Sequence, residues 1–345
     1  MTTMKNDKTC PTGNCPPMDE KLSENLVRLS EGSGGTEMNA LIKAMKEYFP
    51  QDSPWLGADE DAAVTQFTGE NLVFTTDAYV VTPLFFPGGN IGDLAFCGTV
   101  NDLSMMGAKP LGLSLSLVLE EGLPKKELFD IMKTIGTLSR EYNIPIVTGD
   151  TKVVERGAVD KMIITTSGVG SVDIPLTQML SVGDKIIVSG GIGEHGTTLL
   201  SKRFELESDL ITDSAPLHKE IATVKDRIKQ AKDVTRGGLA AILNEFSTKA
   251  GLQVSIEEDD VPMKKEVRAL TEVLGIDVYS LACEGRFVCV VTEKNAPSVL
   301  ADLQKFNTTA AIIGEMIEGD SVRIQTRFGG RMLSMPSGNI VPRIC

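Results

Sequence analysis

The sequence has 345 residues, 41% of them hydrophobic and 23% charged, a composition typical of a soluble globular protein with room for two domains. Its net charge of -13 disfavours nucleic acid as a partner, because a negative field repels a phosphate backbone and favours divalent cations instead. No stretch approaches the roughly 20 apolar residues of a membrane span, and the start of the chain lacks the apolar core of a signal peptide. We therefore expect a cytoplasmic protein with reduced cysteines and no membrane contact.

The N-terminal half of the chain predicts helices and strands in mixed order. Residues 1–31 are polar and aperiodic, which indicates a mobile extension. Beyond them, apolar side chains at helical spacing mark some segments, and short or alternating apolar runs mark others. They predict helices over 37–48, 91–106 and 124–142, and strands over 71–76, 111–119, 144–147 (ending before Thr148) and 162–169.

The C-terminal half follows a linker over 171–184. Its strands are expected over 185–189, 252–256, 286–292 and 311–314, with helices after the glycine-rich turn 190–196, in the charged stretch 205–232 and from the turn 233–238 to about residue 250. From Gly330 on, Pro and Gly recur with little periodicity. The whole pattern predicts an α+β fold of layered helices and sheets, with domains over 32–172 and 173–330 and a flexible tail over 331–345.

Four aspartates stand at strand ends or helix starts, where small residues surround them. Carboxylates of this kind suit Mg²⁺, which takes a few of them together with the phosphates of a substrate. Each one alone is equally explained as a helix cap or a turn residue. These candidate metal ligands are Asp61, Asp77, Asp102 and Asp233.

Glycine-rich segments offer two further candidate sites. Residues 32–35 (Gly-Ser-Gly-Gly) could wrap a phosphate with backbone N–H groups or act as a hinge. Residues 190–196 follow a strand and open a helix, which favours a helix-start turn over a dinucleotide site. No Gly-x4-Gly-Lys-Ser/Thr loop is present, so the sequence excludes a P-loop nucleotide site.

Two cations and one acid could take part in phosphoryl chemistry. Lys152 and Arg236 follow acidic residues closely and could stabilise charge on a phosphate, although each could also be a surface cation. Glu284 precedes a strand and could be a general base or an ordinary turn acid. With His195 and His218 as the only histidines, the sequence gives little support to a histidine-centred triad and excludes a multi-histidine metal site within one chain.

The last residue, Cys345, ends a Gly- and Pro-containing segment that could act as a tether. Such a tether can carry a covalently bound group between sites, and Arg343 beside the thiol would favour the nucleophilic thiolate. The alternative is a terminus without a role. A prenylation signal is excluded because no residue follows the cysteine.

Taken together, these segments resemble the HypE family of hydrogenase maturation proteins. That family lies in the superfamily of aminoimidazole ribonucleotide synthetase and selenophosphate synthetase. The resemblance covers residues 32–345 and is most specific in four segments, namely 75–92, 148–154, 233–238 and the terminal Pro-Arg-Ile-Cys of 342–345.

The resemblance implies an ATP-dependent carbamoyl dehydratase. A carbamoyltransferase of the HypF type would place a carbamoyl group on the terminal sulfur, and ATP would phosphorylate the carboxamide oxygen so that it leaves as phosphate. The resulting thiocyanate would supply the cyanide ligand of the [NiFe] hydrogenase iron through a scaffold complex of the HypC and HypD type. The family also implies a homodimer whose N-terminal sheets pair across the interface, and a C-terminal α+β sandwich.

The resemblance also assigns roles to single residues. Catalysis would fall to Cys345, Glu284, Lys152 and Arg236, with Glu284 removing the amide proton. Magnesium would be held by Asp61, Asp77, Asp102 and Asp233. ATP would be bound by Gly32, Ser33, Gly34, Gly35, Asp77, Asn101, Asp150 and Thr151.

Two other functions stay open at this point. One is a selenophosphate-type synthetase that acts on a free small molecule, for which Cys15 is the tempting residue, although no Lys follows it closely. The other is a non-catalytic maturation scaffold that docks partners through its tail. Loss of carbamoyl-dependent ATP turnover on Cys345→Ala would separate a carbamoyl dehydratase from both of these alternatives.

Overall fold

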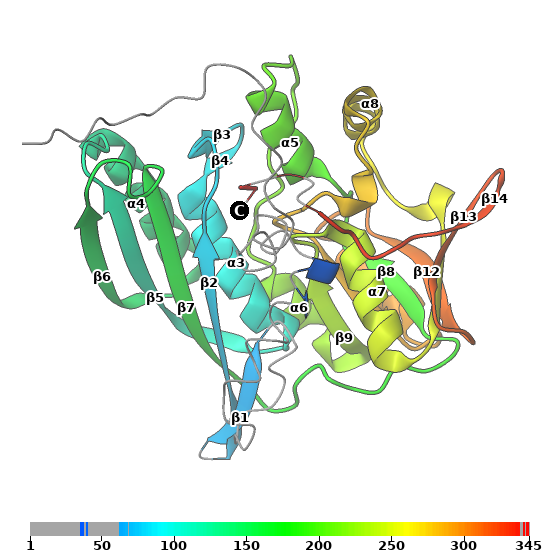
Figure 1. The fold of residues 1–345 in the computed structure, drawn as a ribbon. Coiled ribbons are helices and arrows are strands. Elements are labelled where there is room, and N and C mark those ends of the chain that lie inside the picture. Colours follow the sequence, from blue (N-terminus) through cyan, green and yellow to red (C-terminus); the bar gives the residue numbers. More distant parts are fainter. Residues whose placement is uncertain are drawn as a thin grey trace, which may run out of the picture.

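The computed structural model describes residues 35–37, 39, 40, 62–67, 69–338, 341, 343 and 344. Their strands form two large sheets, one in each half of the chain, and a short hairpin (Figure 1). The predicted extension over 1–31 and most of the predicted helix over 37–48 lie outside the described residues. No described helix is long and apolar enough to cross a membrane.

The N-terminal sheet joins five described strands and carries its helices on one face. Its strands, in spatial order, are β1 (Ala63–Phe67), β2 (Glu70–Tyr79), β7 (Met162–Val172), β5 (Lys109–Glu120) and β6 (Ile146–Val154). Neighbours are antiparallel except β5 and β6, which are parallel. The hairpin of β3 (Phe85–Phe86) and β4 (Gly89–Asn90) leads into helix α3 (Ile91–Met105), and α4 (Lys125–Tyr142) packs beside α3.

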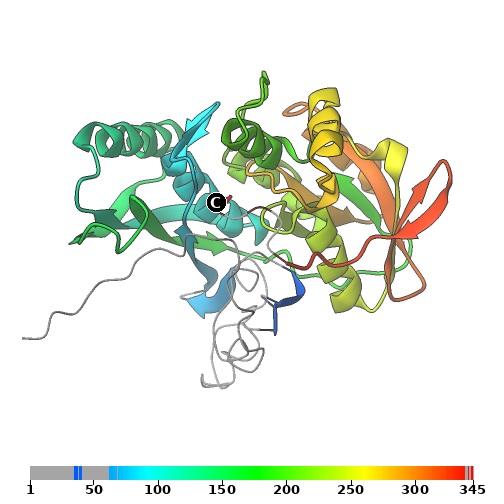
Figure 2. The same cartoon turned by 45° about the horizontal axis from the view of Figure 1, so that its top comes forward.

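Helix α3 lies at the centre of the molecule, between the two sheets (Figures 1 and 2). Asn90 caps its start, because the Asn90 side chain accepts from the Gly92 amide at 2.8 Å while the Asn90 amide donates to Asp93 at 2.7 Å. The helix contacts β2 and β7 on one side and β9 (Ile228–Asp233) on the other. Its sequence is therefore small or apolar almost all round, as expected of a helix buried on every face.

The C-terminal sheet has helices on both faces. Its strands, in spatial order, are β14 (Gly329–Met332), β13 (Val322–Thr326), β10 (Gln253–Glu257), β12 (Ala311–Ile317), β8 (Lys185–Val188), β11 (Phe287–Val291) and β9. Helix α7 (Gly238–Ala250) covers one face, and α6 (His218–Val224) and α9 (Ala296–Leu303) cover the other. Successive residues of β11 enter the two separate cores, which explains its continuous apolar run. Helices α5 (Glu194–Arg203) and α8 (Lys265–Leu274) pack together beside this sheet.

The structure corrects three expectations about local structure. The strand expected to end before Thr148 continues to Val154 as β6, because it pairs with β5 along its length. The charged stretch 205–232 is not a series of surface helices, since only α6 and a short 3-10 turn are helical and β9 is a buried strand paired with β11. Part of the aperiodic end of the chain forms β14, which pairs with β13. The first two corrections come from pairing between distant segments, whereas β14 pairs with the strand that directly precedes it in the chain.

Candidate active site

A small cavity of about 50 Å³ lies where the two halves of the chain meet. Strand β2 and helix α3 line it from the N-terminal half, and the end of β9, the turn after it and the segment before β11 line it from the C-terminal half. The lining residues are Asp77, Ala78, Tyr79, Gly98, Asp102, Asp233, Thr235, Arg236 and Glu284. Five of the predicted site residues, namely Asp77, Asp102, Asp233, Arg236 and Glu284, thus meet in one place.

Strand alternation and helix periodicity set the N-terminal side of the cavity. Asp77 and Tyr79 are two residues apart on β2, so both side chains point to the α3 side of the sheet. Gly98 and Asp102 are four residues apart on α3 and share the helix face that meets β2. Thr75, on the same face of β2, donates from its hydroxyl to Asp102 Oδ2 at 2.7 Å and holds that carboxylate in place.

Two glycine turns set the C-terminal side. Gly237 and Gly238 both have positive φ, 84° and 61°, and a Cβ on Gly238 would lie 2.5 Å from the Tyr279 carbonyl oxygen. This tight turn therefore requires glycine and presents Thr235 and Arg236 to the cavity. A Cβ on Gly285 would lie 1.9 Å from the Asp213 carbonyl oxygen, so only glycine allows the backbone beside Glu284 to pass there.

The backbone of Glu284 is held by three contacts. Its amide donates to Asp213 Oδ1 at 3.1 Å, and its carbonyl accepts from the Ala215 amide at 3.3 Å and from Asn101 Nδ2 at 3.4 Å. Glu284 is only 3% exposed. A carboxylate on so rigid a support is well suited to a precise proton transfer.

Burial and a nearby cation have opposite effects on the pKa of Asp77. Burial raises the pKa of Asp77, while the hydrogen bond from Thr99 at 2.9 Å and the positive charge of Arg236 lower it. Burial also raises the pKa of Tyr79 well above its usual value, and the charges of Asp77 and Asp102 raise it further. Tyr79 therefore stays a neutral phenol, within hydrogen-bonding distance (3.2 Å) of the Thr99 hydroxyl.

The acids of the cavity suit a hard cation that brings further ligands with it. Within the described part of the chain, no three His, Cys, Asp or Glu side chains form a ready-made metal site. Magnesium does not need one, since it is usually held by one or two carboxylates together with phosphate oxygens and water. Asp77, Asp102 and Asp233 offer carboxylates, and Arg236 offers a positive charge for phosphate.

Other predicted site residues lie away from the cavity or outside the described residues. Asn101 is buried, and its amide group contacts the backbone of Ala215, Leu217 and Glu284, so it supports Glu284 instead of lining the cavity. Gly35 packs on the tail, where a Cβ would lie 1.9 Å from the Pro336 carbonyl oxygen. Outside the described residues are Gly32, Ser33, Gly34, Asp61 and Cys345.

The predicted residues of β6 lie on the exposed edge strand of the N-terminal sheet. The register pairs Asp150 with Ser116 of β5, and Ser116 in turn with Thr165 of β7, which places Asp150 on the sheet face opposite Asp77. Lys152 shares this face, while Thr151 points to the other side; all three are exposed. None of the three lines the cavity.

Sequence reasoning missed four residues of the cavity lining, namely Ala78, Tyr79, Gly98 and Thr235. Tyr79 could have been found, because it follows Asp77 by two residues in a strand and so shares its face. Gly98 is a glycine inside a helix, which signals close approach, and a Cβ there would lie 2.3 Å from the Tyr79 hydroxyl. Thr235 carries no comparable local signal.

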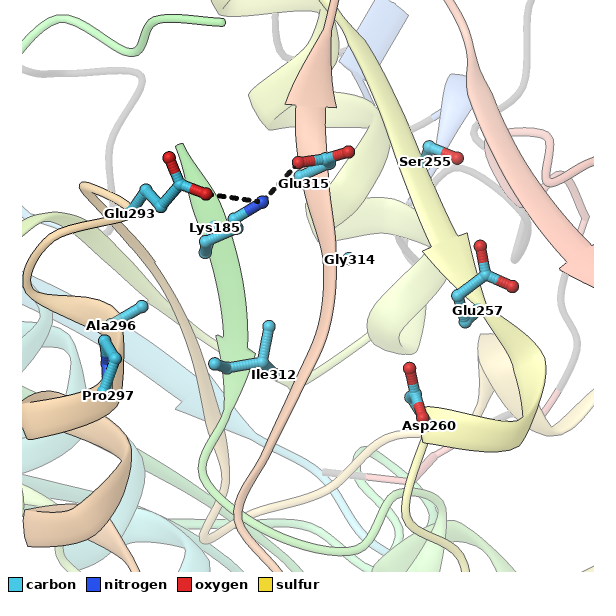
Figure 3. A pocket seen from close by; sticks show the side chains of 10 residues that line it. All are labelled: Lys185, Ser255, Glu257, Asp260, Glu293, Ala296, Pro297, Ile312, Gly314 and Glu315. Atoms are coloured by element: carbon cyan, nitrogen blue, oxygen red, sulfur yellow. Dashed lines mark hydrogen bonds and ion pairs between the residues drawn. The ribbon is translucent and has the colours of Figure 1, made fainter. Parts of the chain in front are cut away.

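A larger groove of about 330 Å³ lies on the C-terminal sheet and contains none of the predicted residues (Figure 3). Lys185 of β8 lies between two of its acids, at 2.5 Å from Glu315 Oε2 and 3.7 Å from Glu293 Oε1 (Figure 3). The charges of Lys185, Glu293 and Glu315 therefore partly neutralise one another within the groove. The smaller cavity between the two sheets is the better candidate active site, because it combines acids, a guanidinium and a rigidly held Glu284.

Comparisons with known proteins agree with this assignment. Two family models match the chain, that of the N-terminal domain of AIR synthase related proteins over residues 59–172 and that of their C-terminal domain over residues 181–327. The carbamoyl dehydratase HypE of Rhizobium leguminosarum bv. viciae is 43% identical over 340 residues, 94% of this chain and 96% of that protein. The carbamoyl dehydratase HypE of Escherichia coli (strain K12) is 42% identical over 337 residues, 93% of this chain and 100% of that protein.

Solved structures give the same picture. A structure of hydrogenase maturation protein HypE in complex with ATP has a TM-score of 0.78 and 40% identity, and the match covers 93% of this chain and 100% of that one. In a HypE–HypF complex the TM-score is 0.79 at 39% identity, with 86% of this chain and 99% of that chain covered. Thiamine monophosphate kinase from Aquifex aeolicus, at 18% identity and a TM-score of 0.63, shares the fold alone. The expected α+β fold is confirmed, and the chain belongs to the HypE family of carbamoyl dehydratases.

Proposed function

We propose that this protein uses ATP to dehydrate a carboxamide on the sulfur of Cys345 to a thiocyanate, which supplies the cyanide ligand of a [NiFe] hydrogenase. The observation that carries the proposal is the meeting of three aspartates, Arg236 and Glu284 in one cavity. The HypE relatives, of which one is solved with ATP and another with HypF, support the same reading.

The reaction balances as a phosphorylation followed by an elimination. The γ-phosphoryl group of ATP moves to the carboxamide oxygen, and ADP leaves. The nitrogen then loses its remaining protons, the carbon–oxygen bond breaks, and phosphate carries the oxygen away from a sulfur-bound C≡N group. Phosphorylation is needed because an amide oxygen is a poor leaving group in water.

Each cavity residue has a role in this chemistry. Asp77, Asp102 and Asp233 would hold magnesium, with Asp61 a further candidate outside the described residues. Bound magnesium would neutralise charge on the phosphates. Arg236 would bind the phosphate oxygens, and Glu284 would accept the proton from the carboxamide nitrogen.

A second copy of the chain would supply Lys152 and Asp150. Both lie on the face of the N-terminal sheet opposite Asp77, which also exposes Phe74 at 41%. A sheet face that exposes a large apolar side chain, as this one does among the described residues, favours association with another sheet. The homodimer formed in this way would bring these residues toward the partner's nucleotide.

A mixed-dimer experiment tests the shared site. Asp77→Asn and Lys152→Ala should each abolish dehydration as homodimers. Mixing the two should restore activity, because one of the two sites in a mixed dimer then contains both native residues. Mixtures that stay inactive, although native mass spectrometry detects mixed dimers, would show that Lys152 does not act across the interface.

The remaining partners follow from the substrate chemistry. A carbamoyltransferase of the HypF type would load the thiol, and an iron scaffold of the HypC and HypD type would receive the cyano group. Both would have to reach Cys345. Pull-down of each partner by the wild-type chain and by a chain that ends at Ile344 measures how far the last residue contributes to their binding.

Mass spectrometry of the C-terminal peptide tests the central reaction. After loading by the carbamoyltransferase, the wild-type peptide should lose one water when ATP and magnesium are added. Asp77→Asn should retain the carboxamide, whereas Asp173→Asn, on an exposed acid outside the cavity, should behave as wild type. A carboxamide that persists on the wild-type protein would refute the proposed function.

The base is tested by Glu284→Gln, which keeps the shape of the side chain but cannot take up the proton. We expect the single-turnover rate to fall by about 10²- to 10⁴-fold while ATP still binds. An unchanged rate would remove Glu284 from the mechanism.

A further inference from the structure

The glycine-rich turn over 190–196 contains a buried histidine that contacts the C-terminal tail. His195, on the first turn of α5, is 0% exposed. Its Nε2 lies 3.0 Å from the carbonyl oxygen of Ile344, and its Nδ1 lies 2.8 Å from the Thr212 hydroxyl. The Phe86 ring packs against the imidazole in an edge-to-face arrangement, with ring centroids 5.4 Å apart.

These contacts select one form of the imidazole. A carbonyl oxygen only accepts, so Nε2 must carry the hydrogen and donate it to Ile344. Nδ1 then accepts from the Thr212 hydroxyl, whose oxygen in turn accepts from the Ser214 amide at 3.1 Å. The Ser214 amide thus donates to the Thr212 hydroxyl, which donates to His195, and His195 donates to the Ile344 carbonyl oxygen.

The glycines of the turn explain why α5 can bring a histidine to this place. Gly193 has a φ of 76°, and a Cβ on it would lie 2.9 Å from Val278. The Gly193 amide donates to Cys283 Sγ at 3.1 Å, and the Gly196 amide donates to the Ala282 carbonyl at 3.0 Å. The start of α5 therefore rests directly on the segment that precedes Glu284.

A second anchor from α5 holds the neighbouring tail residue. Arg203 donates from Nε to the Thr82 carbonyl at 2.6 Å and from Nη2 to the Arg343 carbonyl, which also accepts from the Thr82 amide at 3.3 Å. Ile344 is 6% exposed and belongs to the core cluster of the N-terminal half. Two consecutive carbonyl groups of the tail are thus held at one surface, which the C-terminal segment reaches after crossing from β14 (Figure 1).

One short loop connects the tail contact with the cavity. Thr212 contacts His195, and the next residue, Asp213, accepts from the Glu284 amide at 3.1 Å. Gly285 packs against the Asp213 carbonyl so closely that no Cβ would fit. The position of the Ile344 carbonyl is therefore linked to the position of Glu284 by adjacent residues of a tightly packed loop.

We propose that His195 is a positioning residue that docks the C-terminal tail by donating a hydrogen bond to the Ile344 carbonyl, the last peptide group before Cys345. This inference rests on the proposed function for its catalytic consequence. Docking fixes the point from which the Cys345 carboxamide extends and raises its effective concentration near Glu284. The docking itself is a property of the unmodified chain.

Two substitutions separate the contact to the tail from the bulk of the side chain. The amide of His195→Gln reproduces a donor at the position of Nε2, whereas the shorter His195→Asn reproduces only a group at Nδ1. We expect His195→Asn to speed hydrogen exchange in the C-terminal peptide of the full-length chain by about tenfold, the effect of one net hydrogen bond. His195→Gln should stay within about threefold of wild type, and His218→Asn, on the other histidine, should match wild type.

A catalytic readout accompanies the exchange measurement. Single-turnover loss of water from the Cys345 carboxamide should slow about tenfold in His195→Asn and recover in His195→Gln, with the Kd for ATP unchanged in both. Should His195→Asn fold poorly, Thr212→Val, which removes the partner of Nδ1, should also speed exchange of the tail.

The outcomes distinguish the two proposals. The role of His195 is overturned if the C-terminal peptide of His195→Asn exchanges as slowly as that of wild type. It is also overturned if the peptide exchanges as fast in His195→Gln as in His195→Asn. A wild-type chain that keeps its carboxamide overturns the proposed function, while the exchange comparison still decides the docking contact.

Discussion

Gly98→Ala should destabilise the protein although alanine favours helices. Gly98 lies inside α3, where alanine by itself would stabilise the helix by about 1 kcal/mol. The new Cβ would lie 2.3 Å from the Tyr79 hydroxyl and 3.1 Å from the ring carbons Cε1 and Cζ. Tyr79 is only 5% exposed, so its ring has little room to withdraw except into the cavity.

The balance of these effects is a net loss. Overpacking a closed site costs about 1–3 kcal/mol, and displacing the Tyr79 hydroxyl from Thr99, 3.2 Å away, costs about 1 kcal/mol more. After the gain from helix propensity, the free energy of unfolding should fall by about 2 kcal/mol. The displaced ring should also fill a cavity of about 50 Å³ and weaken ATP binding.

Urea unfolding and ATP titration measure both effects. Gly98→Ala combined with Tyr79→Phe should recover part of the stability, because the closest contact disappears while those at 3.1 Å remain. Gly136→Ala in α4 is the matched control, since its Cβ would meet only Arg140 at 3.4 Å and should stabilise by up to about 1 kcal/mol. If Gly98→Ala behaved like Gly136→Ala, the close packing of Gly98 against Tyr79 would be refuted.

Three further predictions concern the support of the site. Gly285→Ala should lower the thermal midpoint strongly and misplace Glu284, because the Cβ would lie 1.9 Å from a backbone oxygen; wild-type stability would contradict the close approach. Burial lowers the pKa of His195 from 6.5 to about 4, so the unfolded chain takes up this proton first and stability falls as pH falls from about 6.5 to 4. The loss should reach about 3 kcal/mol, and urea unfolding at several pH values should show it in wild type and a flatter profile in His195→Gln. Burial also raises the pKa of the thiols of Cys283 and Cys289, that of Cys289 to about 12, so alkylation mapped by mass spectrometry should label both only after unfolding, and labelling of the native protein would show that the core opens.

Local patterns in the sequence were sufficient for much of the fold. Helical spacing predicted α3 and α4 within a residue or two, and short or alternating apolar runs predicted the strands β5 and β7. The turns over 190–196 and 233–238 were also recognisable from their glycines, because the backbone there takes a positive φ that favours glycine. The terminal cysteine and the motifs of the chain were enough to identify the family.

Tertiary structure alone decided which of these residues meet. Asp77 and Glu284 line one cavity although they come from opposite halves of the chain. The pairing of β6 with β5 extends the strand beyond its expected end and so places Lys152 on an exposed edge strand. His195 and Ile344, separated by 149 positions, share a hydrogen bond that no local pattern encodes. Periodicity reports which face of an element is buried, whereas the partner across that face depends on how distant segments pack, and the chemistry of this site depends on that partner.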